Sequence, residues 1–111
     1  MSSLSTHVLD LTHGKPAAGV AVRLLRGEDV LFQGTTNADG RCPELPSLAL
    51  SPGRHRLEFE IAAYFAAMGA ALTEPPFLDV VPIDFGVADA GGHYHVPLLV
   101  SPFGYSTYRG S

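Results

Sequence analysis

The sequence predicts an all-β domain, either a sandwich or a barrel, with a single short helix. Turn-forming clusters of glycine, proline, asparagine and aspartate recur at short intervals along its 111 residues. Between them lie short runs with alternating apolar and polar residues or with β-branched residues, as in regular short strands. One Ala-rich stretch departs from this pattern. We expect one domain over residues 1–111, because this length fits a single core.

The alternation predicts strands bounded by turn signals. Arg54–Glu60 is the clearest case, because Leu57 and Phe59 share one face and Glu58 lies on the other. In chain order, the expected strands are Ser5–Leu11, Val20–Arg26, Val30–Thr35, Arg54–Glu60, Phe77–Phe85, His93–Val100 and Phe103–Tyr108. Pro97 lies inside one of them. Since proline has no N–H to donate, we expect that strand to be an edge strand or locally irregular.

The exception to the strand pattern is Ile61–Ala71, which we predict to be a short helix. It is rich in alanine and has no β-branched residue after Ile61. Phe65 and Met68 follow at helical spacing, and we interpret the aromatic side chains of this segment as packing onto a sheet. The pair Pro75 and Pro76 is expected to end the helix.

Composition excludes several functions. The formal net charge is −4 and the chain has no Lys/Arg cluster, so we expect neither a nucleic-acid partner nor a membrane surface as partner. A single cysteine, Cys42, cannot form an intrachain disulfide, which suits a reducing compartment. The first residues resemble no signal peptide, and the longest apolar run, Ile61–Leu72, is too short to span a bilayer. We therefore expect a cytoplasmic protein.

Polar residues that could take part in chemistry are concentrated at the end of the chain. The segment His93–Ser111 contains two histidines, three tyrosines, an arginine and several serines within β-like stretches. Chain termini are usually frayed and generic in composition. This composition indicates a terminus that folds back into a site.

His7 is the first candidate. On a strand Ser5–Leu11, the side chains of Ser5, His7, Leu9 and Leu11 point the same way, so we place His7 on the apolar face. Taken alone, this position is more typical of a buried histidine bonded to backbone than of a catalytic residue.

His93 and His95 form a His-x-His pair that projects to one side of a strand. Such a pair can bind zinc, and His7 could supply a third nitrogen ligand with an open position for a hydroxide. The spacing carries little weight, because no carboxylate or second Cys/His pair follows at a supporting position. A zinc hydrolase is therefore the lesser alternative.

Arg41 leaves a tight turn, Asn37-Ala38-Asp39-Gly40, whose Asp-Gly pair favours a positive φ at Gly40. The turn would give Arg41 a defined direction, although a solvated loop cation is an equal alternative.

The final Tyr108-Arg109-Gly110-Ser111 follows β-prone residues. Its last hydroxyl, beside a free carboxylate, could bond a polar ligand. The residues alone thus support a β-sandwich with a possible site of histidine, arginine and serine.

Three blocks of sequence resemble the 5-hydroxyisourate hydrolases, the transthyretin-like enzymes of urate breakdown. The blocks are Leu4–Asp10 with Gly14–Ala17, then Thr35–Arg41, then His95–Pro102 with Tyr105–Ser111. The closing Tyr-Arg-Gly-Ser is the most specific feature, because it separates the hydrolases from transthyretin hormone carriers of the same fold. The resemblance implies a sandwich of two four-stranded sheets with one short helix. It also implies a homotetramer, a dimer of dimers, with active sites in a channel between dimers.

The resemblance also implies a set of site residues and a reaction. The catalytic set is His7, Arg41, His95 and Ser111, while Tyr108, Arg41 and Ser111 bind substrate, with no metal and no cofactor. The enzyme would open 5-hydroxyisourate with water at the N1–C6 bond, giving 2-oxo-4-hydroxy-4-carboxy-5-ureidoimidazoline.

The chemistry of these residue types suits ring opening. One histidine would activate water and the other return a proton, while the arginine fork stabilises the oxyanion and substrate carbonyls. The positive charge of Arg41 should lower the pKa values of both histidines. Which histidine is the base stays open, and His93 is expected to be peripheral. A carrier of a hydrophobic small molecule with the same fold is the alternative function.

Overall fold

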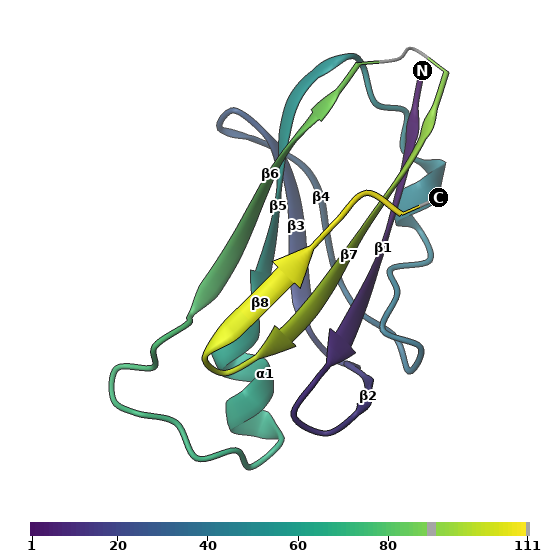
Figure 1. Cartoon of the computed structure of the whole chain (residues 1–111). Helices are drawn as coiled ribbons and strands as arrows, with labels where there is room; N and C mark the ends of the chain where they lie inside the picture. The colour runs from purple at the N-terminus through teal and green to yellow at the C-terminus, as the bar shows by residue number, and fades with distance from the viewer. Residues whose placement is uncertain (89–90, 111) are drawn as a thin grey trace.

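The computed structural model describes residues 1–88 and 91–110, and within them the chain forms two four-stranded sheets packed face to face (Figure 1). The first sheet has the order β2-β1-β7-β8 and the second the order β4-β3-β5-β6. The strands are β1 Ser3–Asp10, β2 Lys15–Pro16, β3 Ala21–Arg26, β4 Asp29–Thr35, β5 Gly53–Glu60, β6 Val80–Val87, β7 His93–Ser101 and β8 Gly104–Thr107. The predicted fold class is confirmed.

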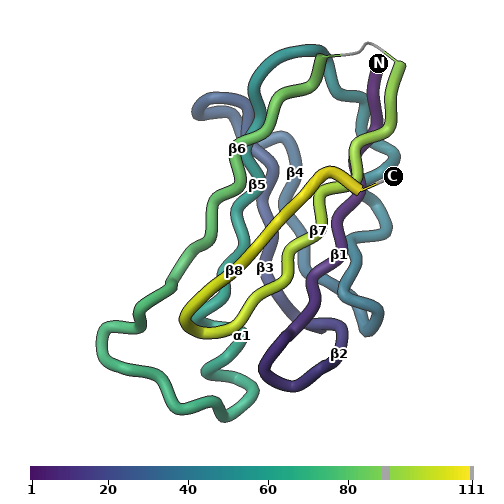
Figure 2. The backbone as a smooth tube through the Cα atoms, in the orientation of Figure 1, coloured from purple at the N-terminus to yellow at the C-terminus, as the bar shows by residue number. Residues whose placement is uncertain are grey.

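The first sheet has a parallel centre. Strands β1 and β7 pair in parallel from Ser3 opposite His93 to Asp10 opposite Val100, so the first long strand lies beside the strand that begins the last part of the chain. The short β2 and the hairpin partner β8 flank them in antiparallel fashion. After β8 the backbone turns back onto β7, where Gly110 forms an isolated antiparallel bridge with His95 (Figure 2).

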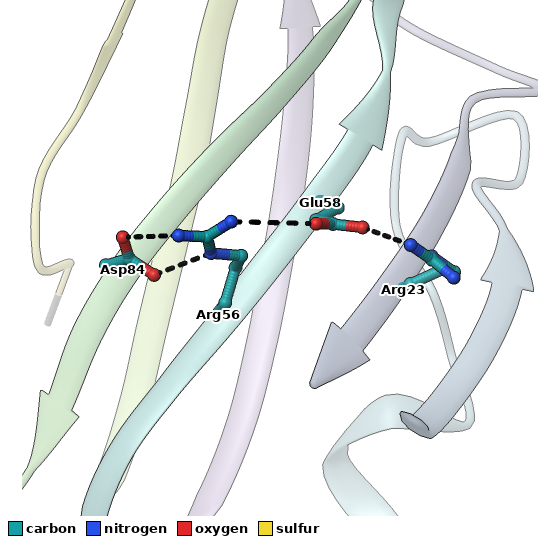
Figure 3. A network of polar contacts seen from close by, with 4 residues as sticks. All are labelled: Arg23, Arg56, Glu58 and Asp84. Carbon is teal, nitrogen blue, oxygen red and sulfur yellow. Dashed lines mark hydrogen bonds and ion pairs between the residues drawn. The ribbon is translucent and has the colours of Figure 1, made fainter. Parts of the chain in front are cut away.

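The second sheet is antiparallel and carries a row of charges on its outer face. Arg23 on β3, Glu58 and Arg56 on β5, and Asp84 on β6 form a continuous network (Figure 3). Arg56 donates from Nε and one terminal nitrogen to both oxygens of Asp84, at 2.8 and 3.1 Å. Because these groups are largely exposed, the network contributes little to stability and chiefly keeps this face polar.

The core fills the space between the two sheets. It is made of aliphatic and aromatic side chains from both inner faces and from the helix, chief among them Leu4, Val8, Leu24, Leu57, Phe59, Ile61, Phe65 and Leu98. On β1 the buried face is Leu4, Thr6, Val8 and Asp10. The prediction that His7 lies on the buried apolar face was therefore wrong, since internal hydrogen bonds allow the polar Thr6 and Asp10 to occupy that face instead.

The predicted helix exists but is shorter than expected. Helix α1 spans Ile61–Ala67, not Ile61–Ala71. Gly69 ends it by adopting a left-handed φ of 80°, and the Ala70 N–H donates to the Phe65 carbonyl at 3.0 Å. The proline pair expected to end the helix therefore lies beyond the true end.

Two strand predictions also need correction. Strand β6 begins at Val80 rather than Phe77, because Phe77 is exposed and instead packs against the ring of Phe103.

Pro97 lies in the central strand β7 and not in an edge strand. Its carbonyl faces the β8 side, where it accepts a bond from Thr107 Oγ1 at 2.7 Å, and β8 ends at that residue. The position at which Pro97 has no N–H to donate therefore lies at the end of the β7–β8 hydrogen-bond ladder. Strand β2 and a short 3-10 turn, η1 (Leu45–Ser47), were not predicted.

Candidate active site

Two histidines share the outer face of the first sheet because β1 and β7 run in parallel. Their register places His95 opposite Ser5 and Pro97 opposite His7, so the two imidazoles are diagonal neighbours on adjacent strands. Both side chains are half-buried, and the alternate residues of each strand point into the core. The register therefore joins two residues that lie far apart in the sequence.

Arg41 reaches this face from a loop that is bonded to β1. The Asn37 side chain accepts bonds from the N–H groups of Asp39 and Arg41, at 2.9 and 3.1 Å, which closes the turn. The Val8 N–H donates to the Gly40 carbonyl at 2.8 Å, which ties the turn to the strand. Arg41 is exposed, and within the described residues its guanidinium forms no hydrogen bond or ion pair. The cation is therefore available to a ligand.

Gly40 shows why this turn fits so closely. Its φ is 74°, the positive value that the Asp-Gly pair predicted. A Cβ there would lie 2.5 Å from the Val8 carbonyl oxygen and 3.3 Å from Cδ2 of His7. The turn therefore packs its backbone against the edge of the first imidazole.

The segment after β8 packs against the second imidazole in the same way. The Gly110 N–H donates to the His95 carbonyl at 2.8 Å, and a Cβ at Gly110 would lie 2.5 Å from Cδ2 of His95. The Arg109 guanidinium stacks on Tyr94, with its central carbon 4.1 Å from the ring centroid. The expectation that the end of the chain folds back is thus confirmed as far as Gly110. Ser111 lies outside the described residues.

Ser5 joins the two histidines of β7. Its Oγ is hydrogen-bonded to Nδ1 of His95 at 2.7 Å and to Nε2 of His93 at 3.0 Å. Ser3 Oγ is bonded to the other nitrogen of His93, at 2.6 Å. Within the described part of the chain, no three histidine, cysteine or carboxylate side chains form a group that could hold a metal ion. The alternative zinc site of His7, His93 and His95 is therefore not formed.

The pKa of His95 lies below its ordinary value. Burial is the main cause, and the nearby positive charges of Arg41, His7 and His93 add to it. The prediction that Arg41 lowers the pKa of a neighbouring histidine is thus confirmed for His95, although burial contributes more. A neutral imidazole at neutral pH can accept a proton, as hydrolysis requires.

Tyr108 lies in the wall of a cavity of about 290 Å³ between the facing edges of β6 and β8. Tyr94 and Arg109 line it as well, but among the described residues that line it His7, Arg41 and His95 are absent. These three residues, which the family resemblance groups in one catalytic set, lie near one another on the outer face of the first sheet. Sequence reasoning missed the bridging role of Ser5 and the close packing of Gly40 and Gly110 against the imidazoles, which depend on strand register and backbone contacts that a single sequence does not reveal.

The fold and this cluster define a class of protein: a two-sheet β-sandwich that bears a polar site of two imidazoles and a guanidinium. Residues 4–110 match the HIUase/Transthyretin family. The chain belongs to this family.

Curated relatives with a named activity are similar to this chain over its whole length. It is 55% identical to the 5-hydroxyisourate hydrolase of Caulobacter vibrioides and 51% identical to that of Ralstonia nicotianae, in both cases over the full length of both chains. The solved structure of Klebsiella pneumoniae 5-hydroxyisourate hydrolase is similar with a TM-score of 0.86 and 41% identity, covering all of this chain and 94% of that one.

Two solved structures of other proteins share the fold. The transthyretin of Sparus aurata is similar with a TM-score of 0.85 and 30% identity, covering 96% of this chain and 95% of that one. A crystal structure of (S)-allantoin synthase has a TM-score of 0.91 and 39% identity, covering 99% of this chain but only 44% of that one. In the described residues, no helix has the length and apolar character needed to cross a membrane.

Proposed function

We propose that this chain is a metal-independent hydrolase that opens the ring of 5-hydroxyisourate in urate breakdown. The observation that carries the proposal is the meeting of His7, Arg41 and His95 on one sheet face. It occurs in a chain that is 55% identical to a curated 5-hydroxyisourate hydrolase. The product is 2-oxo-4-hydroxy-4-carboxy-5-ureidoimidazoline.

The reaction adds water across one cyclic amide bond. A neutral imidazole removes a proton from water, and the resulting hydroxide attacks the C6 carbonyl carbon. The N1–C6 bond breaks, and N1 receives a proton from an imidazolium. His7 and His95 share these two proton transfers.

Arg41 stabilises the negative charge that develops on the attacked carbonyl oxygen. Its planar fork can hold that oxygen and a second substrate carbonyl together. The free guanidinium and the free ring nitrogens of His7 in the described residues support this role, because nothing else occupies them. We assign Ser111 and Tyr108 to orienting substrate or water, with Tyr108 acting from the wall of the cavity between β6 and β8.

The working unit is a homotetramer of one-domain subunits, a dimer of dimers in the cytoplasm. Two observations support burial of apolar surface between copies of this chain. The chain is similar to a transthyretin, and the side chains of Phe77, Phe103 and Tyr108 are exposed in the single chain. Analytical ultracentrifugation tests the tetramer, and a monomer at micromolar concentration would contradict it.

Ultraviolet absorbance of freshly generated 5-hydroxyisourate tests the activity. We expect the wild-type protein to accelerate its decay and Arg41→Gln to lose about 10²–10³-fold of that acceleration. Arg54→Gln is the matched control, because Arg54 is an exposed arginine on the other sheet. A decay that the wild-type protein leaves unchanged would favour a small-molecule carrier instead.

A further inference from the structure

Four side chains form a continuous hydrogen-bonded row on the outer face of β1 and β7. The parallel register places Ser3 opposite His93 and Ser5 opposite His95. The bonds run from Ser3 Oγ to His93 Nδ1 at 2.6 Å, from His93 Nε2 to Ser5 Oγ at 3.0 Å, and from Ser5 Oγ to His95 Nδ1 at 2.7 Å. The row begins at the half-buried His95 and passes through the exposed His93 to Ser3. We call it the serine–histidine row.

We propose that the serine–histidine row carries a proton between His95 and solvent, and that His93 is a positioning residue which acts through Ser5. The proposal rests on the proposed hydrolase function and deepens it. His95 Nδ1 is engaged by Ser5, so Nε2 is the nitrogen that meets water or substrate. His93 does not need to touch the substrate.

The row can be ordered in two directions. In the first, His95 Nδ1–H donates to Ser5, Ser5 donates to His93 Nε2, and His93 Nδ1–H donates to Ser3. In the second, each donor and acceptor is exchanged, and His95 carries its proton on Nε2. The first order makes Nε2 of His95 a proton acceptor, and the second makes it a donor.

One proton converts the first order into the second. Nε2 of His95 takes a proton from the attacking water, and Nδ1 passes its own proton to Ser5 Oγ. Ser5 passes its original proton to His93 Nε2, His93 Nδ1 passes one to Ser3 Oγ, and Ser3 releases one to solvent. One proton enters at His95 and one leaves at Ser3, only N–H and O–H bonds break and form, and no bond between two heavy atoms changes. The reverse sequence, in which Ser3 takes a proton from solvent while Nε2 of His95 gives its proton up, restores the first order.

The charges around His95 favour such an exit. Of the described elements, β1 contributes His7, the turn contributes Arg41 and β7 contributes His93, while Gly110 contributes only uncharged backbone. Burial and these charges make an imidazolium at His95 costly, as its lowered pKa indicates. His93 is exposed and Ser3 is half-buried, so this end of the row is open to solvent.

A double-mutant cycle of turnover tests the row. We expect His93→Ala and Ser5→Ala each to lower kcat by about tenfold with little change in KM, since a proton route serves the chemical step. The double variant should lose no more than Ser5→Ala alone, and Ser5→Thr should retain turnover. Ser47→Ala is the control, because its Oγ bonds only to the Glu44 carbonyl. Losses that multiply, or a His93→Ala variant as fast as wild type, would overturn the proposal.

Added imidazole separates proton transfer from a merely structural role. Imidazole in the buffer should restore turnover to His93→Ala, because a small base can stand in for the missing ring, and should leave Ser5→Ala slow. Failure to restore His93→Ala would contradict the relay even if the wild-type enzyme is fully active.

Nitrogen-15 NMR of the histidines tests the row without turnover, so its result is independent of the proposed function. Both directions require His93 and His95 to carry their protons on the same ring nitrogen when neutral, at about pH 8. The row is supported if neutral His93 and His95 carry their protons on the same ring nitrogen in the wild-type protein and no longer do so together in Ser5→Ala. Opposite tautomers in the wild-type protein would leave Ser5 as a double acceptor and break it.

Discussion

Strand β1 supports two polar clusters, one on each face, and they differ in what they leave unsatisfied. On the inner face, Asp10 is fully buried, and it accepts bonds from the Tyr64 hydroxyl at 2.7 Å and from backbone N–H groups at 2.9 and 3.0 Å. Its carboxylate also lies 2.6 Å from Nδ1 of His13. On the outer face, the ring nitrogens of His7 and the guanidinium of Arg41 have no partner within the described residues.

The comparison shows how one strand separates stability from chemistry. A buried carboxylate with every oxygen bonded holds α1 and the β1–β2 turn against the sheet, and it has no capacity left for a ligand. The half-buried imidazoles and the free cation stabilise little, but they can bond a substrate. We therefore expect substitutions on the two faces to act on different measurements.

The largest expected effect comes from His95→Ala on the outer face. Loss of this imidazole should lower kcat/KM by about 10²–10⁴-fold, the usual contribution of a general acid or base, with little change in unfolding temperature. His13→Ala is the matched histidine variant, in the β1–β2 turn and bonded to the inner cluster through Asp10, and it should lower the unfolding temperature while turnover per folded molecule persists. The reverse pattern would show that the two clusters have been assigned to the wrong roles.

Asp10→Ala should have the largest effect on stability. It leaves the Tyr64 hydroxyl buried without its acceptor, so we expect the free energy of unfolding to fall by about 3 kcal/mol, as measured by denaturant titration. Tyr64→Phe in the same background should then cost little more, because the two residues share one interaction. If the losses of unfolding free energy in Asp10→Ala and Tyr64→Phe add up in the double variant, the two residues do not share one hydrogen bond.

Gly110→Ala sharpens the comparison, because it alters the outer cluster without removing a functional group. The new methyl group would lie 2.5 Å from Cδ2 of His95, so the ring or the tail must move. We expect kcat/KM to fall by about tenfold, the scale of a small misplacement of a reacting group. Gly91→Ala is the control, since a Cβ there meets nothing within 4 Å. Equal activity in both variants would remove the packing argument.

Acid should weaken the inner cluster. Burial by itself raises the pKa of Asp10, but the bonds from Tyr64 and His13 outweigh it, and the net pKa lies below the ordinary value. An Asp with a lowered pKa stabilises the fold above the unfolded-state pKa of about 3.9, and this contribution is lost as pH falls through the folded-state value. Unfolding free energies measured from pH 5 downward should decline less in Tyr64→Phe than in wild type.

The smallest effect concerns the pKa of His95. Because Arg41 is a secondary cause of the lowered value and burial is the main one, Arg41→Gln should raise the pKa only part of the way to about 6.5. An NMR titration of His95 in both proteins measures this shift, with Arg54→Gln as control. A pKa that falls in Arg41→Gln would place the guanidinium away from the imidazole.

Much of the fold followed from alternation, and the misses have physical reasons. Seven strands were predicted within a few residues, most clearly those that bury one face, as Leu57 and Phe59 do in β5. Strand β2 was missed because its two residues are both exposed and leave no periodicity. The end of α1 was misplaced because only the two prolines were taken as a stop signal, although the left-handed backbone of Gly69 ends the helix first.

The candidate site could be predicted only in part. The presence of His7, Arg41 and His95 was visible because the residue types and the family resemblance pointed to them. The burial of Asp10 in place of His7 was not, since it depends on Tyr64, a partner on a distant helix. The bridging role of Ser5 depends on a register of β1 against β7 that no local pattern encodes.

The parallel pairing of β1 with β7 has a consequence for biosynthesis. A ribosome extrudes β1 early and β7 late, so the edge of β1 that pairs with β7 stays unsatisfied in a nascent chain until nearly all of the domain has emerged. Closing so long a loop is slow, which leaves β1 as the segment most in need of a chaperone. Activity is therefore the last property that a newly made molecule acquires, and its appearance times the completion of folding.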